Sequence, residues 1–200
     1  DALLFKLTQH YQNLTYEELY LKIESLAKGL IRMGLDNKIK GALLCANRPE
    51  WVITDLALLS LGNVTVPIYP TLAAEEIKGI LNDCQAKILF LETKDHYQKI
   101  LQIEKDCPNL EKIIVMCSVP GKLSEKFITF SDMLHLGEVK KEEKQKEWEE
   151  KQSSVKAHDI ATIVYTSGST GAFKGVVLSH LNLLSNVQGF LTFGLIKASD

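Results

Sequence analysis

The chain has 200 residues, of which 46% are hydrophobic and 24% charged, with a formal net charge of −2 and a pI of about 6.3. This ordinary globular composition provides no polycationic surface for nucleic acid, and the longest apolar runs are too short to span a bilayer. Four cysteines, none in a C-x-x-C pair and none preceded by a signal peptide, predict reduced thiols and a cytoplasmic protein: Cys45, Cys84, Cys107 and Cys117.

The first predicted element is a long amphipathic helix. Thr15 and Glu18 have the spacing of a capping box, in which the hydroxyl and the carboxylate each accept from the other residue's backbone N–H. Apolar residues then recur at helical spacing as far as Ile31, and Gly34 can end the helix in a left-handed conformation.

Strands and helices then alternate. Short apolar runs predict strands over 39–46, 64–69, 87–91 and 113–116, and amphipathic stretches predict helices over 49–61, 75–83 and 95–105. Pro49 suits the first turn of its helix. Alternation of this kind predicts an α/β fold, with a largely parallel sheet covered by helices on both faces.

A charged segment interrupts this pattern. Lys and Glu dominate residues 138–151, and Trp148 is the only large apolar residue there after Val139. We therefore expect three parts: an α/β subdomain over 1–136, a charged linker or exposed helix over 137–157, and a loop-bearing segment over 158–200.

The stretch from Tyr165 to Gly175 is the strongest chemical signal in the sequence. Four hydroxyl side chains, three glycines and one lysine lie between an apolar run over 160–164 and another over 176–178. Glycines let backbone N–H groups face an anion, hydroxyls add donors and lysine adds charge. The pattern predicts a strand, a phosphate-binding loop and a second strand.

Familiar phosphate motifs do not fit this stretch. In a Walker A alignment Phe173 takes the place of the second glycine, and Gly175 that of the Mg²⁺-binding Ser or Thr. The Rossmann G-x-G-x-x-G and the hydrolase G-x-S-x-G are also absent. Gly168 to Gly171 has the G-x-x-G of KH domains, but its flanks are strands without basic residues.

Residues 159–182 instead closely resemble the signature of the adenylate-forming enzymes, usually Y-T-S-G-[ST]-T-G-x-P-K-G-V. The long-chain fatty acyl-CoA synthetase branch is resembled by two upstream stretches, Asn47-Arg48-Pro49-Glu50-Trp51 and the run from Val66 to Thr71. The helix that opens at Leu14 also stands where this family has a helix. The resemblance spans nearly the whole chain and implies part of the large N-terminal, AMP-binding domain. Phe173 departs from it, because the family usually has proline there.

The resemblance implies a function and a site. Such enzymes join a carboxylate to ATP with Mg²⁺, release pyrophosphate and pass the acyl group to CoA. The residues that match the ATP-phosphate loop are Thr166, Ser167, Gly168, Ser169, Thr170, Gly171 and Lys174. No metal ligand is assigned, and the main catalytic groups are expected downstream of Asp200. A lipid substrate also raises the expectation of peripheral membrane contact, although no basic amphipathic helix supports it.

Several alternatives stay open. We expect an N-terminal-side fragment of a long-chain fatty acid–CoA ligase that is inactive alone. The other interpretations are a ligase for a different carboxylate, and a non-catalytic nucleotide-binding or interaction module. Phe173, which replaces the usual proline, is the feature that favours the non-catalytic module. Outside the loop, scattered histidines such as His96 are expected at the surface, and Arg48 and Trp51 are expected to pack at a helix start.

Overall fold

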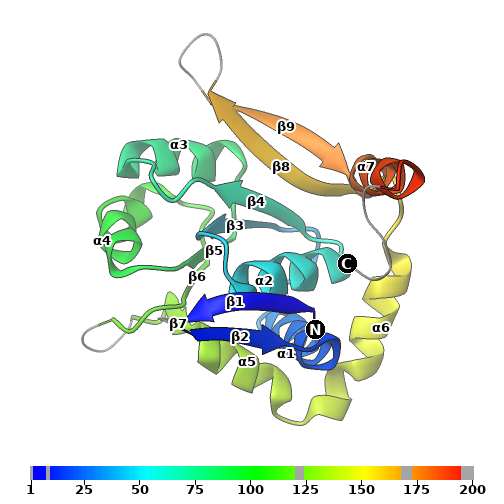
Figure 1. The fold of residues 1–200 in the computed structure, drawn as a ribbon. Helices are drawn as coiled ribbons and strands as arrows, with labels where there is room; N and C mark the ends of the chain where they lie inside the picture. The colour runs from blue at the N-terminus through cyan, green and yellow to red at the C-terminus, as the bar shows by residue number, and fades with distance from the viewer. Residues whose placement is uncertain (1, 8–9, 120–123, 168–172, 195–200) are drawn as a thin grey trace.

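A computed structural model describes residues 2–7, 10–119, 124–167 and 173–194 (Figure 1). The α-helices are α1 (Tyr16–Arg32), α2 (Pro49–Ser60), α3 (Ala74–Asp83), α4 (Lys94–Ile103), α5 (Phe130–Glu138), α6 (Gln145–Ser154) and α7 (His180–Thr192). The strands are β1 (Leu3–Leu7), β2 (His10–Leu14), β3 (Lys40–Leu44), β4 (Val64–Ile68), β5 (Ile88–Leu91), β6 (Lys112–Val115), β7 (Phe127–Thr129), β8 (Ile160–Ser167) and β9 (Phe173–Ser179). Two 3₁₀ turns, Glu104–Asp106 and Lys141–Lys144, follow α4 and precede α6.

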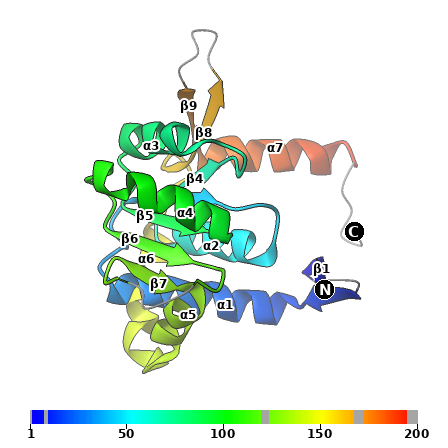
Figure 2. The ribbon, with the colours of Figure 1, turned by 90° about the vertical axis from the view of Figure 1, so that its left-hand side faces the viewer.

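Seven of these strands form one sheet in the order β7-β6-β5-β3-β4-β8-β9. Every neighbouring pair is parallel except β8 and β9, which form an antiparallel hairpin at one edge. The predicted α/β class with a largely parallel sheet is confirmed. The β8–β9 hairpin extends away from the body of the molecule in both ribbon views (Figures 1 and 2).

Helices cover both faces of the sheet. Leu43 and Phe90 point toward the face packed by α1, α2 and α5, whereas their neighbours Leu44 and Leu89 point toward α3 and α4. All four side chains are fully buried. Because successive residues of a strand face opposite sides, a central strand with two covered faces needs a continuous apolar run. That requirement explains why these strands carry no polar alternation.

The predicted helix ends are confirmed. The Thr15 hydroxyl accepts from the backbone N–H of Glu18 at 3.2 Å, and the Glu18 carboxylate accepts from the backbone N–H of Thr15 at 2.8 Å. Gly34 follows the helix with a φ of +70°. Pro49 occupies the first position of α2. Local sequence therefore sets where these helices begin and end.

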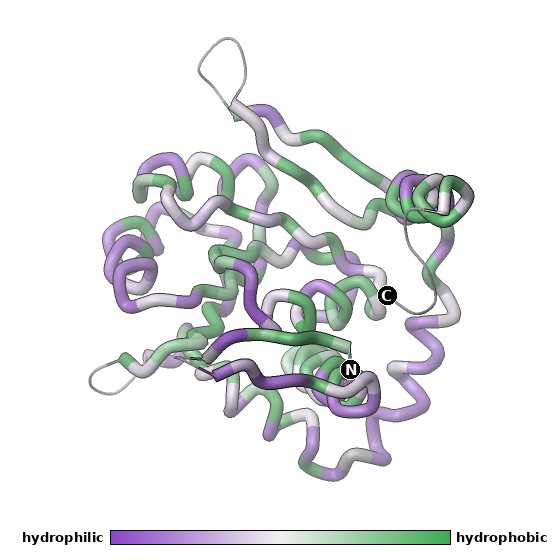
Figure 3. Tube along the Cα trace, viewed as in Figure 1, coloured by the Kyte–Doolittle hydropathy of each residue, from purple (hydrophilic) through white to green (hydrophobic). Residues whose placement is uncertain are grey.

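The charged segment folds onto the body. Its helix α6 is mostly hydrophilic along its trace (Figure 3), in keeping with its Lys- and Glu-rich sequence. Trp148 is nevertheless completely buried, which composition did not predict. Its ring lies 5.7 Å from the ring of Tyr20 in α1. One aromatic side chain thus anchors an otherwise polar helix.

Four other elements were not predicted from the sequence. β1 and β2 pair as a separate antiparallel hairpin before α1. β7 adds an edge strand to the sheet, and α5 packs against α1 in the same core cluster. β7 has only three residues and β2 has a weak apolar pattern, so their pairing depends on partners elsewhere in the chain.

Candidate phosphate-binding site

The β8–β9 hairpin brings the two ends of the hydroxyl-rich motif together. In its register Thr166 pairs with Lys174, and Ser167 pairs with Phe173. β8 runs to Ser167 and β9 starts at Phe173, so both strands extend further into the motif than the apolar runs predicted. The expectation that the loop spans residues 166–174 is therefore corrected. Thr166, Ser167 and Lys174 lie on strands because the antiparallel ladder continues past the apolar residues.

Three of the seven predicted site residues can be placed. Thr166, Ser167 and Lys174 are exposed at the outer end of the hairpin. The other four, Gly168, Ser169, Thr170 and Gly171, lie outside the described residues. The structure therefore brings a lysine and two hydroxyl side chains to one end of the sheet.

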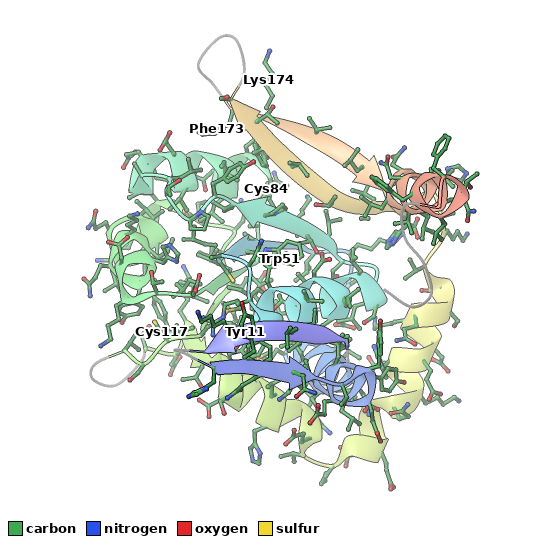
Figure 4. All side chains as sticks on the ribbon, viewed as in Figure 1. Tyr11, Trp51, Cys84, Cys117, Phe173 and Lys174 are labelled. Atoms are coloured by element: carbon green, nitrogen blue, oxygen red, sulfur yellow. The ribbon has the colours of Figure 1, made fainter. Side chains whose placement is uncertain are left out.

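Lys174 is available for an external anion. Its side chain points outward from the end of the hairpin (Figure 4). It makes no ion pair or hydrogen bond with any residue in the described part of the chain. A lysine ammonium is a flexible point charge with three donors, which suits it to phosphate oxygens.

Phe173, where the family usually has proline, has a packing role. Its side chain is partly buried and packs against the core cluster shared by the sheet, α3 and α4. An aromatic side chain thus ties the start of β9 to the body of the molecule.

Tyr165 holds the hairpin from the inside. It is 4% exposed, and its hydroxyl donates a hydrogen bond to a carboxylate oxygen of Asp83 at the end of α3. Burial, and then this hydrogen bond, raise the pKa of Tyr165 above its ordinary value, so the phenol stays protonated. Sequence reasoning assigned no role to either residue, and Asp83 belongs to no motif.

A hollow of about 410 Å³ lies beside Tyr165. Its walls include Cys45, Trp51, Tyr69 and Val164, from the carboxyl ends of β3 and β4, the start of α2 and the outer part of β8. In open α/β sheets ligands bind at this edge, outside the carboxyl ends of the strands. The aromatic lining suits an apolar or ring-shaped group next to the hairpin.

A larger hollow of about 1040 Å³ lies at the same edge, where the chain passes from β4 on one side of β3 to β5 on the other. Arg48 lines it together with Lys6 and Lys22, and two carboxylates flank the Arg48 guanidinium. Nε of Arg48 lies 2.7 Å from Glu50, and Nη1 lies 3.5 Å from Glu92. Since these carboxylates neutralise Arg48, its guanidinium offers no strong anion site. Arg48 also lies at the start of α2, as expected.

The buried His96, Cys45 and Cys84 side chains have no role in this site. Among the described residues no three His, Cys, Asp or Glu side chains are grouped so as to hold a metal ion. His96 is buried, not at the surface, and its Nε2 lies 3.1 Å from the carbonyl oxygen of Pro70. Burial raises the pKa of the Cys45 thiol to about 12 and that of Cys84 to about 11, which leaves both unreactive.

Comparison with known proteins identifies the family and the fold. The family model of the AMP-binding enzyme matches residues 1–199. The long-chain-fatty-acid–CoA ligase ACSBG1 of Rattus norvegicus is 31% identical over 183 residues, which cover 92% of this chain and 25% of that protein. The long-chain-fatty-acid–CoA ligase FadD15 of Mycobacterium bovis is 32% identical over 180 residues, covering 90% and 28%. The crystal structure of coronafacic acid ligase from Pectobacterium brasiliense superimposes with a TM-score of 0.73 at 22% identity, covering 88% of this chain and 32% of that one.

The sheet and its edge hairpin have the fold of adenylate-forming ligases. The chain belongs to the AMP-binding enzyme family, and long-chain fatty acid–CoA ligases are among its homologues. It spans about a quarter of the length of the curated relatives described above. No helix in the described ranges has both the length and the apolar character needed to cross a bilayer.

Proposed function

We propose that these 200 residues are the N-terminal-side part of an ATP-dependent long-chain fatty acid–CoA ligase. The observation that supports this most directly is the pairing of Thr166 with Lys174 at the exposed end of the hairpin. The pair brings a hydroxyl and an uncompensated ammonium to the ends of the family's signature motif. The family and its CoA ligase homologues supply the reaction class.

The reaction has two halves. A fatty acid carboxylate oxygen attacks the α-phosphorus of ATP, the bond to the bridging oxygen breaks and pyrophosphate leaves. The thiol of CoA then attacks the acyl carbon and AMP departs. Both steps depend on stabilising charge on phosphate oxygens in a preorganised site.

The residues of this chain act in the first half. We assign Lys174 and the hydroxyls of Thr166, Ser167, Ser169 and Thr170 to the β- and γ-phosphates, and Gly168 and Gly171 to close backbone approach. Each charge-assisted hydrogen bond contributes about 1.5–3 kcal/mol. Mg²⁺ is expected to arrive with ATP, because the described residues contain no acidic cluster that would hold it in advance. ATP, Mg²⁺, a carboxylic acid and CoA are therefore the proposed ligands.

The proposal also covers the arrangement of the whole protein. It divides the chain into residues 1–136, 137–157 and 158–200. It also includes a cytoplasmic location and peripheral membrane contact. We propose that residues 1–200 alone do not catalyse the reaction, because the groups that hold the ribose and complete adenylation are expected beyond Asp200.

The experiment compares the protein expressed from its complete coding sequence with residues 1–200. Carboxylate-dependent ATP–pyrophosphate exchange and acyl-CoA formation are measured with saturated fatty acids of increasing length, acetate and benzoate. Lys174→Ala and Thr170→Ala are each expected to weaken ATP binding about ten- to a hundredfold. Lys146→Ala is the matched control, since Lys146 is an exposed lysine on α6.

The outcomes separate the alternatives. Exchange with long fatty acids that depends on Lys174 supports the proposal, whereas exchange only with acetate or benzoate indicates a ligase for another carboxylate. ATP binding without exchange for any acid indicates the non-catalytic module, toward which Phe173 points. Unchanged affinity and turnover in Lys174→Ala together with Thr170→Ala overturns the phosphate assignment. Exchange by residues 1–200 alone overturns the inactive-fragment assignment.

A further inference from the structure

Tyr165 is the last inward-facing residue of β8 before the candidate phosphate site. It is almost completely buried, whereas its neighbours Thr166 and Ser167 are exposed. Its hydroxyl reaches the carboxylate of Asp83, which lies 82 residues earlier in the chain. The exposed carboxylate of Asp83, at the end of α3, therefore holds the hydroxyl end of the buried Tyr165 ring.

The face of the same ring is fixed from across the hairpin. Gly175 is the register partner of Tyr165. A Cβ placed on Gly175 would lie 2.8 Å from Cγ2 of Ile163 and 3.2 Å from Cζ of Tyr165, so the ring occupies the space that a side chain there would need. Tyr165 is thus held at its hydroxyl by α3 and at its ring by β9.

This arrangement determines which residues face outward. Side chains alternate along a strand, so an inward Tyr165 places Thr166 on the opposite face, paired with Lys174. A slip of one residue in an antiparallel pair would turn each side chain of that strand to the other face. Fixing Tyr165 therefore fixes the pairing of the two ends of the candidate site.

We propose that Asp83 and Tyr165 are positioning residues for the phosphate site, and that their hydrogen bond sets the register of the hairpin for ATP. Neither residue touches the nucleotide. The inference rests on the proposed function, since the group being positioned is the ATP-binding hairpin. It adds a residue outside the signature motif to the machinery of that site.

The test uses the protein expressed from its complete coding sequence, with MgATP as the probe. Tyr165→Phe, Asp83→Ala, Asp83→Asn and the Tyr165→Phe/Asp83→Ala double variant are compared by ATP affinity and by amide hydrogen exchange in β8 and β9. Tyr16→Phe is the matched control, because Tyr16 is 73% exposed at the start of α1. Lys174→Ala is measured in parallel to report on the phosphate site itself.

We expect Tyr165→Phe and Asp83→Ala each to weaken ATP binding about three- to tenfold and to speed exchange in the hairpin. The double variant should bind ATP no more weakly than either single variant, because both substitutions remove the same hydrogen bond. Asp83→Asn should retain most of the affinity, because its amide oxygen still accepts from the phenol. Tyr16→Phe should match the parent protein.

The contradicting results can be told apart. If Lys174→Ala weakens ATP binding but both pair variants bind normally, the positioning role is wrong and the proposed function stands. Additive losses in the double variant also overturn it, because the residues would then act separately. If Lys174→Ala binds ATP normally, the proposed function and this inference fail together. If Tyr165→Phe does not fold, the two substitutions at exposed Asp83 decide the outcome.

Discussion

The indole nitrogen of Trp148 in α6 donates a hydrogen bond to the hydroxyl of Ser60 at the end of α2, across 3.0 Å. The same indole lies 5.9 Å from the ammonium of Lys28 in α1. One fully buried side chain therefore joins α6 to α1 and α2. Because α6 is the last helix before β8, this anchor also fixes where the hairpin segment begins.

Replacing Trp148 with alanine should destabilise the fold strongly. We expect Trp148→Ala to lower the free energy of unfolding by about 3–5 kcal/mol, through lost apolar burial and the cavity left behind. Urea denaturation followed by circular dichroism measures the change. Lys146→Ala, on the exposed side of the same helix, should change stability by less than about 0.5 kcal/mol. Equal losses of stability in both variants would contradict the anchoring role of the buried Trp148 side chain.

Substitutions in the ion pair beneath this tryptophan should have non-additive effects on the free energy of unfolding. Nζ of Lys28 lies 2.9 Å from Oε1 of Glu24, with side chains 0% and 5% exposed. Lys28→Met removes the buried cation of this pair, and we expect a loss of about 3–5 kcal/mol. Lys28→Met combined with Glu24→Gln should lose less, because neither charge is then buried. A double-mutant cycle by urea denaturation measures this, and additive losses would contradict it.

Two glycines should respond in opposite directions to alanine. Gly175→Ala would force its methyl group against Ile163 and Tyr165, and we expect a loss of about 1–3 kcal/mol in stability. Gly79, in α3, has no atom within 4 Å of an added Cβ. Gly79→Ala should therefore stabilise the fold by about 0.5–1 kcal/mol, since alanine restricts the unfolded chain and favours helix. Thermal unfolding of both variants would show the contrast, and equal shifts would refute the close approach at Gly175.

The buried thiols should weaken the fold at alkaline pH. Burial raises the pKa of Cys84 to about 11, above the ordinary value of 9.0 that applies in the unfolded chain. The unfolded thiol thus loses its proton first. Stabilisation by the neutral thiol is complete below pH 9 and is lost as the pH rises toward about 11.

The measurement for this thiol compares the parent protein with Cys84→Ala from pH 8 to pH 11. The stability advantage of the parent should shrink above pH 9, while the titration of other groups cancels in the difference. An advantage that stays constant across this range would contradict the raised pKa. Cys45, with its pKa raised to about 12, should show the same trend over a wider range.

Local patterns in the sequence predicted much of this fold because they depend on neighbouring residues. The capping box at Thr15 and Glu18, the left-handed Gly34 and the apolar strand of Ile88–Leu91 each depend on chemistry within a few positions. The hydroxyl-rich motif was also readable, since its glycines, hydroxyls and lysine are contiguous. Its strands nevertheless extend further than their apolar runs, because cross-strand pairing continued the ladder to Ser167 and Phe173.

The sequence by itself determined the α/β class, the order of most helices and strands, and the stretch that is predicted to carry the phosphate chemistry. Only the tertiary structure decided the order of strands in the sheet, the burial of Trp148 and the contact between Asp83 and Tyr165. These features depend on segments tens of residues apart whose packing has no local pattern, since the free energy of burying a side chain depends on what surrounds it after folding.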